Sequence, residues 1–300
     1  MVFAHLSNVV VLALLAVSQL SSAQPHGERH GRRFATPDGA STTGDKGGIV
    51  YSPYNADGTC KDQSSFLSDA AQLQGFSRLR LYGIDCNQVT YGIAAAKQYG
   101  FKLFLGIHNI ASSDDEIKQL ITQVGSDWGL VDTVSVGNEV VNSGQMSASD
   151  VAARVNSARD LLRPAGYTGP VVTVDTFVAI MANPVLCEAS DYAAANCHPF
   201  FDGKVAASAS GDFLKTQSQN VQNACGGKKV LITETGWPSQ GNSNGACVPS
   251  PDNQAAALSS IKSAMGSNVI YFTAFDDLWK TDTPATFNAE KHWGIQNLGF

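Results

Sequence analysis

Two glutamates occur in matching surroundings, far apart in the sequence. Glu234 follows the apolar run at residues 230–232, and Glu139 ends a second β-branched stretch at residues 133–139. Short runs of this kind are typical of strands that are buried on both sides of a parallel sheet. A single glutamate is more often a solvated loop residue. A turn glycine and a tryptophan within three residues of Glu234 favour a site instead.

The pair indicates a particular chemistry. Two carboxylates that flank one bond are the working groups of glycoside hydrolysis: a protonated one donates to the leaving oxygen, and an ionised one lies across the sugar ring. Asn138 directly precedes Glu139 and is a candidate to hydrogen-bond the sugar 2-hydroxyl, a contact that strengthens in the transition state. We therefore assign Glu139 as the acid/base and Glu234 as the nucleophile.

Both glutamates require a scaffold that brings the ends of distant strands together, and the chain alternates between strand and helix patterns from residue 47 onward. Strands are predicted at residues 49–54, 79–82, 103–107, 133–140, 171–176, 192–200, 230–233 and 269–275. Helices are predicted at residues 66–73, 89–96, 113–124, 149–162, 212–224 and 253–265. Eight strand–helix units can close into a single (β/α)8 TIM barrel over residues 46–300. Closure removes both sheet edges and places every strand's carboxyl end on one face.

Two local signals refine this assignment. Ser113 and Glu116 have the spacing of a capping box at the start of the third helix. Pro184 interrupts the segment after the fifth strand, so the helix there should be short or irregular.

Composition limits the classes of partner. Of the 300 residues, 43% are hydrophobic, enough for a large core, and the net charge is −6. The sequence contains no basic stripe, so neither nucleic acid nor an anionic membrane is an expected partner. A neutral polysaccharide is compatible with this charge.

The first 45 residues differ from the rest. An apolar run at residues 9–17 is too short to span a bilayer, and Ser21 and Ala23 form a small-x-small cleavage site. We interpret residues 1–23 as a secretory signal peptide, with a buried helix as the alternative, and expect a secreted, extracellular or cell-wall protein. Residues 24–45 are predicted to be disordered or a removed propeptide. Their Arg32–Arg33 pair is either a processing site or two solvated arginines.

The cysteine content is also typical of a secreted protein. Six cysteines follow the predicted signal peptide, and an even number in a secreted chain favours disulfides, with fifteen possible pairings. No C-x-x-C pair occurs and the histidines lack metal-ligand spacing, so a zinc site is the weaker interpretation. We expect no metal and no cofactor.

Several segments resemble a known family. The stretch L-I-T-E-T-G-W-P-S-Q-G around Glu234 and the stretch S-V-G-N-E around Glu139 resemble the nucleophile and acid/base signatures of glycoside hydrolase family 17. The similarity extends through residues 51–54, 80–83, 275–280 and 292–294, which look most like the fungal cell-wall branch. The resemblance implies action on β-1,3-glucan with retention of configuration and two carboxyls about 5–5.5 Å apart.

The same resemblance implies sugar-binding roles for further residues, and an aromatic ring complements the C–H face of a pyranose. The implied contacts, beside Asn138, are Tyr54, Tyr82, Trp237, Asp276 and Lys280. The alternative for Tyr82 and Trp237 is a core aromatic with a satisfied polar tip. Weaker candidates at strand ends are Asp175, His198 and Phe200, and Asp276 and Asp277 are the rival carboxylates.

Three functions remain to be distinguished. The first is an endo-β-1,3-glucanase and/or β-1,3-glucanosyltransferase that remodels the fungal cell wall; the two activities differ in whether water or a second glucan attacks the intermediate. The second is a catalytically inactive, secreted glucan-binding wall protein, which loss of either glutamate would have favoured. The third, a metal-dependent hydrolase on the same barrel, lacks ligands.

Overall fold

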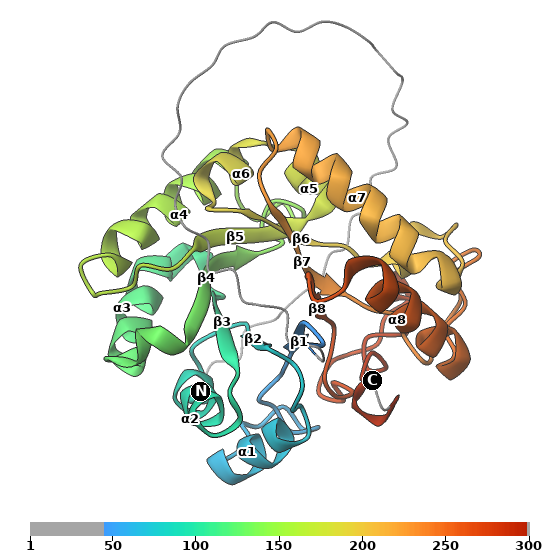
Figure 1. Ribbon diagram of the computed structural model, residues 1–300, viewed down its shortest axis with the longest axis horizontal. Helices are drawn as coiled ribbons and strands as arrows, with labels where there is room; N and C mark the ends of the chain where they lie inside the picture. The colour runs from blue at the N-terminus through green and yellow to red at the C-terminus, as the bar shows by residue number, and fades with distance from the viewer. Residues whose placement is uncertain (1–44, 299–300) are drawn as a thin grey trace, which may run out of the picture.

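The computed structural model describes residues 45–298, so the predicted signal peptide and nearly all of the 24–45 segment lie outside the described residues. Within that range eight parallel strands form a closed barrel in sequence order, each hydrogen-bonded to the next and β1 to β8. Figure 1 shows the helices as an outer ring around the strands. The prediction of a (β/α)8 barrel is confirmed.

The strands and helices alternate along the chain. The strands are β1 Gly48–Val50, β2 Arg78–Leu81, β3 Lys102–Ile107, β4 Val131–Asn138, β5 Val171–Thr176, β6 Ala193–Asn196, β7 Val230–Thr235 and β8 Val269–Tyr271. The helices are α1 Gln63–Ala71, α2 Gln88–Tyr99, α3 Ser113–Val124, α4 Ala148–Leu162, α5 Phe177–Ala182, α6 Val185–Ala189, α7 Ser210–Ala224 and α8 Pro251–Met265.

Most of these elements match the prediction, including the irregular fifth unit, in which two short helices flank Pro184. The capping box is wrong. The 3-10 turn Ile110–Ser112 runs directly into α3, so Ser113 already lies inside the helix and is buried. The Glu116 carboxylate instead accepts the backbone N–H of Asn109 at 3.2 Å.

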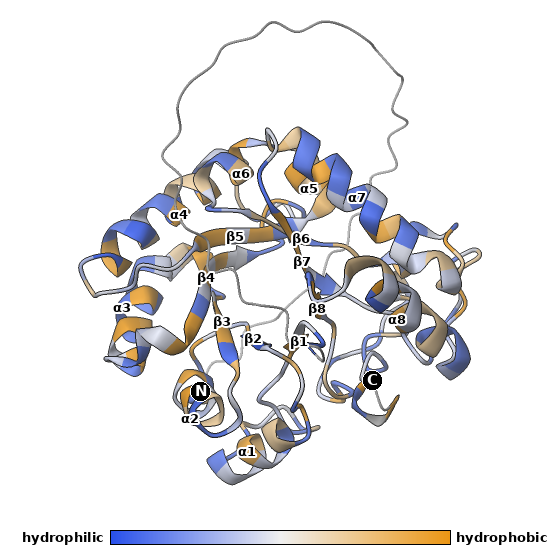
Figure 2. Ribbon diagram, in the orientation of Figure 1, coloured by the Kyte–Doolittle hydropathy of each residue, from blue (hydrophilic) through white to orange (hydrophobic). Residues whose placement is uncertain are grey.

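The core has two layers because successive strand residues face opposite sides. On β2, Leu79 and Leu81 pack outward into the large cluster between barrel and helices, whereas Arg80 faces the interior. Hydropathy in Figure 2 follows this arrangement, with hydrophobic strands at the centre and hydrophilic stretches on the outer helices. The interior cluster consists of Val50, Phe104, Val172, Val174, Ala194, Leu231 and Ile270.

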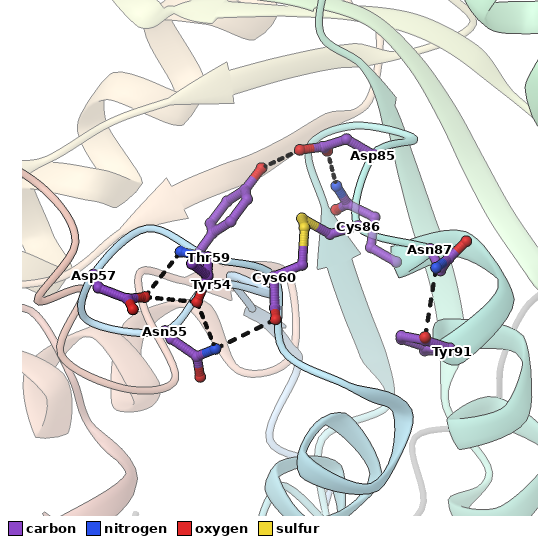
Figure 3. Close-up of a disulfide and its surroundings, with 10 residues drawn as sticks. Tyr54, Asn55, Asp57, Thr59, Cys60, Asp85, Cys86, Asn87 and Tyr91 are labelled. Carbon is purple, nitrogen blue, oxygen red and sulfur yellow. Dashed lines mark hydrogen bonds between the residues drawn. A yellow bond between two sulfur atoms is a disulfide. The ribbon is translucent and has the colours of Figure 1, made fainter. Parts of the chain in front are cut away.

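Two disulfides are present, so the prediction of disulfide bonds is confirmed, and they use four of the six cysteines. Cys60–Cys86 joins the loop after β1 to the loop after β2 (Figure 3). Cys187–Cys225 joins α6 to the end of α7. Cys197 and Cys247 are buried free thiols. No helix within residues 45–298 is long and apolar enough to cross a membrane.

Candidate active site

The carboxylate of Glu234 lies at the carboxyl end of the wholly buried strand β7 and is itself 6% exposed. Three side chains from two other parts of the barrel meet it. The Tyr82 hydroxyl donates to Oε1 at 2.6 Å, and Arg80 Nη1 donates to the same oxygen at 3.0 Å. His198 Nε2 lies 3.2 Å from Oε2. Both oxygens are therefore held in place.

These contacts determine the charge of Glu234. Burial alone would raise its pKa, but the Arg80 charge and the hydrogen bonds from His198 and Tyr82 outweigh burial and hold the pKa at about 2. Hydrogen bonds and an opposite charge favour the ionised form of a carboxyl. Glu234 is thus a buried carboxylate that stays ionised over the ordinary pH range.

Arg80 connects four strands. It is 1% exposed. Its Nη1 also donates to the Thr233 carbonyl at 2.7 Å and to Asn196 Oδ1 at 3.3 Å, and its Nη2 donates to Asn138 Oδ1 at 2.8 Å. Its guanidinium lies 4.6 Å from the centre of the Tyr82 ring. The planar fork of arginine suits such multiple contacts, so this residue ties β2 to β4, β6 and β7.

Glu139 follows β4 directly, at a sharp change of backbone direction. Its φ is 55° and that of Gly137 is 79°, a left-handed conformation that a non-glycine residue adopts rarely. The Glu139 Oε1 accepts the side-chain N–H of Asn196 at 3.0 Å. Because Asn196 also contacts Arg80, a chain of two residues links the two glutamates at one barrel mouth.

The surroundings shift the pKa values of the two carboxyls in opposite directions. Desolvation in the barrel mouth, followed by the negative charge of Glu234, raises the pKa of Glu139 to about 7, although the Asn196 hydrogen bond acts in the other direction. Between about pH 2 and pH 7, one carboxyl is therefore protonated while the other is ionised. This is the division that acid/base chemistry on one bond requires.

Tyr54, Asp276 and Lys280 lie on loops at the carboxyl ends of β1 and β8. The Tyr54 hydroxyl donates to Asp85 at 2.8 Å beside the Cys60–Cys86 disulfide (Figure 3), and its ring centre is 4.8 Å from that of Trp279. The Lys280 ammonium lies 4.5 Å from the centre of the Phe272 ring. Asp276 is exposed and accepts the N–H of Gly294.

The structure corrects the expectation for Trp237. Its side chain has no exposed area, its indole N–H donates to the Val248 carbonyl at 3.1 Å, and its ring lies 5.6 Å from that of Phe200. It is the core aromatic of the alternative interpretation, because it lies in a buried cluster that includes Cys247, Ala257 and Trp293. Phe200 is likewise fully buried.

The remaining candidates have structural partners. Asp277 is 5% exposed and accepts the indole N–H of Trp279, with the Lys280 ammonium 3.3 Å from its other oxygen. Asp175 accepts backbone N–H groups only. No group of three or more His, Cys, Asp or Glu residues suited to a metal occurs within residues 45–298.

Sequence reasoning assigned no role to Arg80 or Asn196. A signal for Arg80 was present, because an arginine between Leu79 and Leu81 must face the barrel interior, where a charge needs a partner. No such signal marks Asn196, which ends the alanine-rich strand β6.

Comparison with known proteins agrees with this geometry. Residues 48–294 match the BtgE/BtgC glycoside hydrolase domain. The chain belongs to the BtgE/BtgC glycoside hydrolase family. The chain is 53% identical over 262 residues to the cell surface mannoprotein MP65 of Candida albicans, covering 86% of this chain and 68% of MP65. It is 51% identical over 252 residues to the probable family 17 glucosidase SCW10 of Saccharomyces cerevisiae, covering 83% of this chain and 64% of that protein.

Solved structures show the same barrel. This BtgE/BtgC member is similar to an active-site mutant of a Rhizomucor miehei β-1,3-glucanosyltransferase in complex with laminaritriose. The TM-score is 0.71 at 26% identity, covering 83% of this chain and 92% of that one. One of two plant β-glucan endohydrolases shares the fold, with a TM-score of 0.63 at 17% identity.

Proposed function

We propose that this protein is a retaining glycosidase that acts on β-1,3-glucan through a covalent glycosyl-enzyme intermediate. The observation that carries the proposal is the meeting of Glu139 and Glu234 at one barrel mouth, linked through Asn196 and Arg80, in surroundings that shift their pKa values in opposite directions. The β-1,3 linkage is inferred from the resemblance to the Rhizomucor miehei glucanosyltransferase, whose structure contains laminaritriose. The cell-surface relative MP65 supports a secreted, cell-wall location.

In the first step, protonated Glu139 donates to the glycosidic oxygen while ionised Glu234 attacks the anomeric carbon. The C–O bond to the leaving sugar breaks as the ester to Glu234 forms. Esterification removes the negative charge of Glu234, which is one cause of the raised pKa of Glu139. The pKa of Glu139 therefore falls, and Glu139 is ready to act as a base in the second step.

In the second step, Glu139 takes a proton from the attacking hydroxyl, which comes from water in hydrolysis or from a second glucan in transfer. The oxygen of that hydroxyl bonds to the anomeric carbon as the ester bond to Glu234 breaks, which releases Glu234 as a carboxylate. Two inversions at the anomeric carbon give net retention. An inactive glucan-binding protein would not need a buried, ionised carboxylate opposite a protonated one, since burying charge is unfavourable without a function. We therefore favour the enzyme.

The deciding experiment is product analysis with purified laminarihexaose. Products longer than six sugars indicate transfer, and shorter products alone indicate hydrolysis; no turnover would refute the proposal. In Glu139→Ala with an activated aryl β-glucoside, we expect added azide to restore the reaction and to yield the β-glycosyl azide, whereas an α product would contradict retention. Glu234→Ala should show no such β product.

The pH dependence of the turnover rate is a second test of the roles of Glu139 and Glu234. The rate should be bell-shaped, because Glu234 must be ionised and Glu139 protonated. From the raised pKa of Glu139, about 7, and the lowered pKa of Glu234, about 2, we expect the alkaline limb near neutrality and the acid limb at strongly acidic pH. A rate that changes monotonically with pH would contradict this assignment.

A further inference from the structure

A buried carboxylate on the neighbouring strand holds the turn that carries Glu139. Asp175, in β5, is 1% exposed. Its Oδ2 accepts the N–H of Val141 at 2.9 Å, and its Oδ1 accepts the N–H of Asn142 at 3.2 Å. The N–H of Thr176 donates to Oδ1 at 2.8 Å. All three donors belong to the backbone, two of them in the turn after Glu139.

Glu139 needs this support because of its backbone conformation. A φ of 55° is strained for a non-glycine residue and persists only where the surroundings hold it. The N–H and hydroxyl of Ser143 donate to the Glu139 carbonyl at 2.9 and 2.7 Å, closing the turn from inside. The Glu139 N–H donates to the Val174 carbonyl at 3.0 Å. Asp175 and the Thr176 hydroxyl, which donates to Asn142 Oδ1 at 3.1 Å, attach the following residues of the turn to β5.

The charge of Asp175 also acts on Glu139. The charged groups around Glu139 lie on several strands: Glu234 on β7 and Asp175 on β5 raise its pKa, and Arg80 on β2 lowers it. The Asn196 amide on β6 lowers it further by hydrogen bonding. Removing the negative charge of Asp175 therefore lowers the pKa of Glu139, so that Glu139 loses its proton at lower pH.

We propose that Asp175 is a positioning residue for the acid/base, which holds the left-handed turn at Glu139 through the backbone N–H groups of Val141 and Asn142. The inference rests on the proposed function of Glu139. Asp175 acts through the backbone and through its charge, so its loss should lower kcat more than it raises KM.

The test compares two substitutions of Asp175, with laminarihexaose as substrate. Asp175→Asn keeps the shape, removes the charge and replaces one accepting oxygen with an NH2 group that cannot accept a backbone N–H. We expect kcat to fall about ten-fold or more, KM to change less than about two-fold, and the alkaline limb to move to lower pH. Asp175→Glu keeps the charge and moves it by one methylene, so kcat should fall while the alkaline limb stays at the wild-type position.

Asp191, which contacts the opposite end of β5, provides a matched control. Asp191 Oδ2 accepts the N–H of Val171, the first residue of β5, at 2.7 Å. Asp191→Asn should lower the melting temperature while kcat and the pH profile stay at wild-type values. A purely structural role for Asp175 would give the same pattern in Asp175→Asn.

Two results would overturn the inference. One is a folded Asp175→Asn enzyme with an unshifted alkaline limb. The other is an Asp175→Glu enzyme whose kcat lies within about two-fold of the wild type. This second result would refute the positioning role even if Asp175→Asn does not fold. A wild-type enzyme that fails to turn over laminarihexaose would instead refute the proposed function.

Discussion

Replacing Arg80 with methionine removes the positive charge that keeps Glu234 ionised. The pKa of Glu234 is about 2, against an ordinary value of 4.5. A lowered folded-state pKa contributes stability that is fully present above the unfolded value and is lost as the pH falls through the folded value. The difference corresponds to about 3 kcal/mol above pH 4.5. Breaking a buried ion pair by removing one partner costs about 3–5 kcal/mol, a similar amount.

The loss in Arg80→Met should therefore depend on pH. We expect unfolding free energies from urea titration to fall by about 3 kcal/mol or more at pH 6. At pH 3 the Glu234 carboxyl is already largely protonated in the unfolded chain. The part of the lost unfolding free energy that depends on pH should therefore shrink to roughly half. Turnover of laminarihexaose should fall by about 100-fold or more, with the acid limb moved to higher pH, because Glu234 then binds a proton more readily.

Arg78 provides the matched control on the same strand. Its Nε donates to Asp132 Oδ2 at 2.9 Å, and this ion pair is partly exposed and makes no contact with either glutamate. Arg78→Met should cost about 1 kcal/mol or less and leave turnover unchanged. Equal losses for Arg80→Met at pH 3 and pH 6, or an active Arg80→Met enzyme with an unmoved acid limb, would refute the argument.

Two further outcomes are expected. Tyr82→Phe removes the 2.6 Å hydrogen bond to Glu234, so the pKa of Glu234 should rise and the acid limb should move to higher pH; an unchanged limb would show that this hydroxyl does not control the charge. The Cys60–Cys86 and Cys187–Cys225 disulfides close segments of 26 and 38 residues and should each contribute about 3–4 kcal/mol. Replacing both Cys60 and Cys86 with serine should also raise KM by about two- to ten-fold, because it frees the loop that carries Tyr54 (Figure 3). If this variant has the same KM as the one in which Cys187 and Cys225 are replaced with serine, the first disulfide does not hold a substrate-binding loop.

The barrel itself was predictable because its signals are local. Most strands are short apolar runs, β2 alternates arginine with leucine, and each long helix shows its own period, so eight units follow from neighbouring residues. The two glutamates were found in the same way, since each ends a buried strand, and strands of one parallel barrel present their carboxyl ends on one face.

Errors arose where a residue's role depends on distant neighbours. Trp237 is close to Glu234 in sequence, but its side chain is fully buried and its indole N–H donates to the Val248 carbonyl. Ser113 has the spacing of a capping residue, but the preceding 3-10 turn places it inside α3. Six cysteines correctly predicted disulfides, but the sequence did not indicate that Cys197 and Cys247 remain free thiols. Pattern alone contains no information on which surfaces meet.

Sequence alone determined the fold class and the identity of the two acidic residues, because periodicity and strand ends are properties of contiguous residues. Only the tertiary structure decided their charges. Arg80 and Asn196 reach the glutamates across the barrel over separations of 154 and 57 residues. A pKa depends on burial and on charges within a few ångströms in space, and that proximity exists only once the barrel has closed.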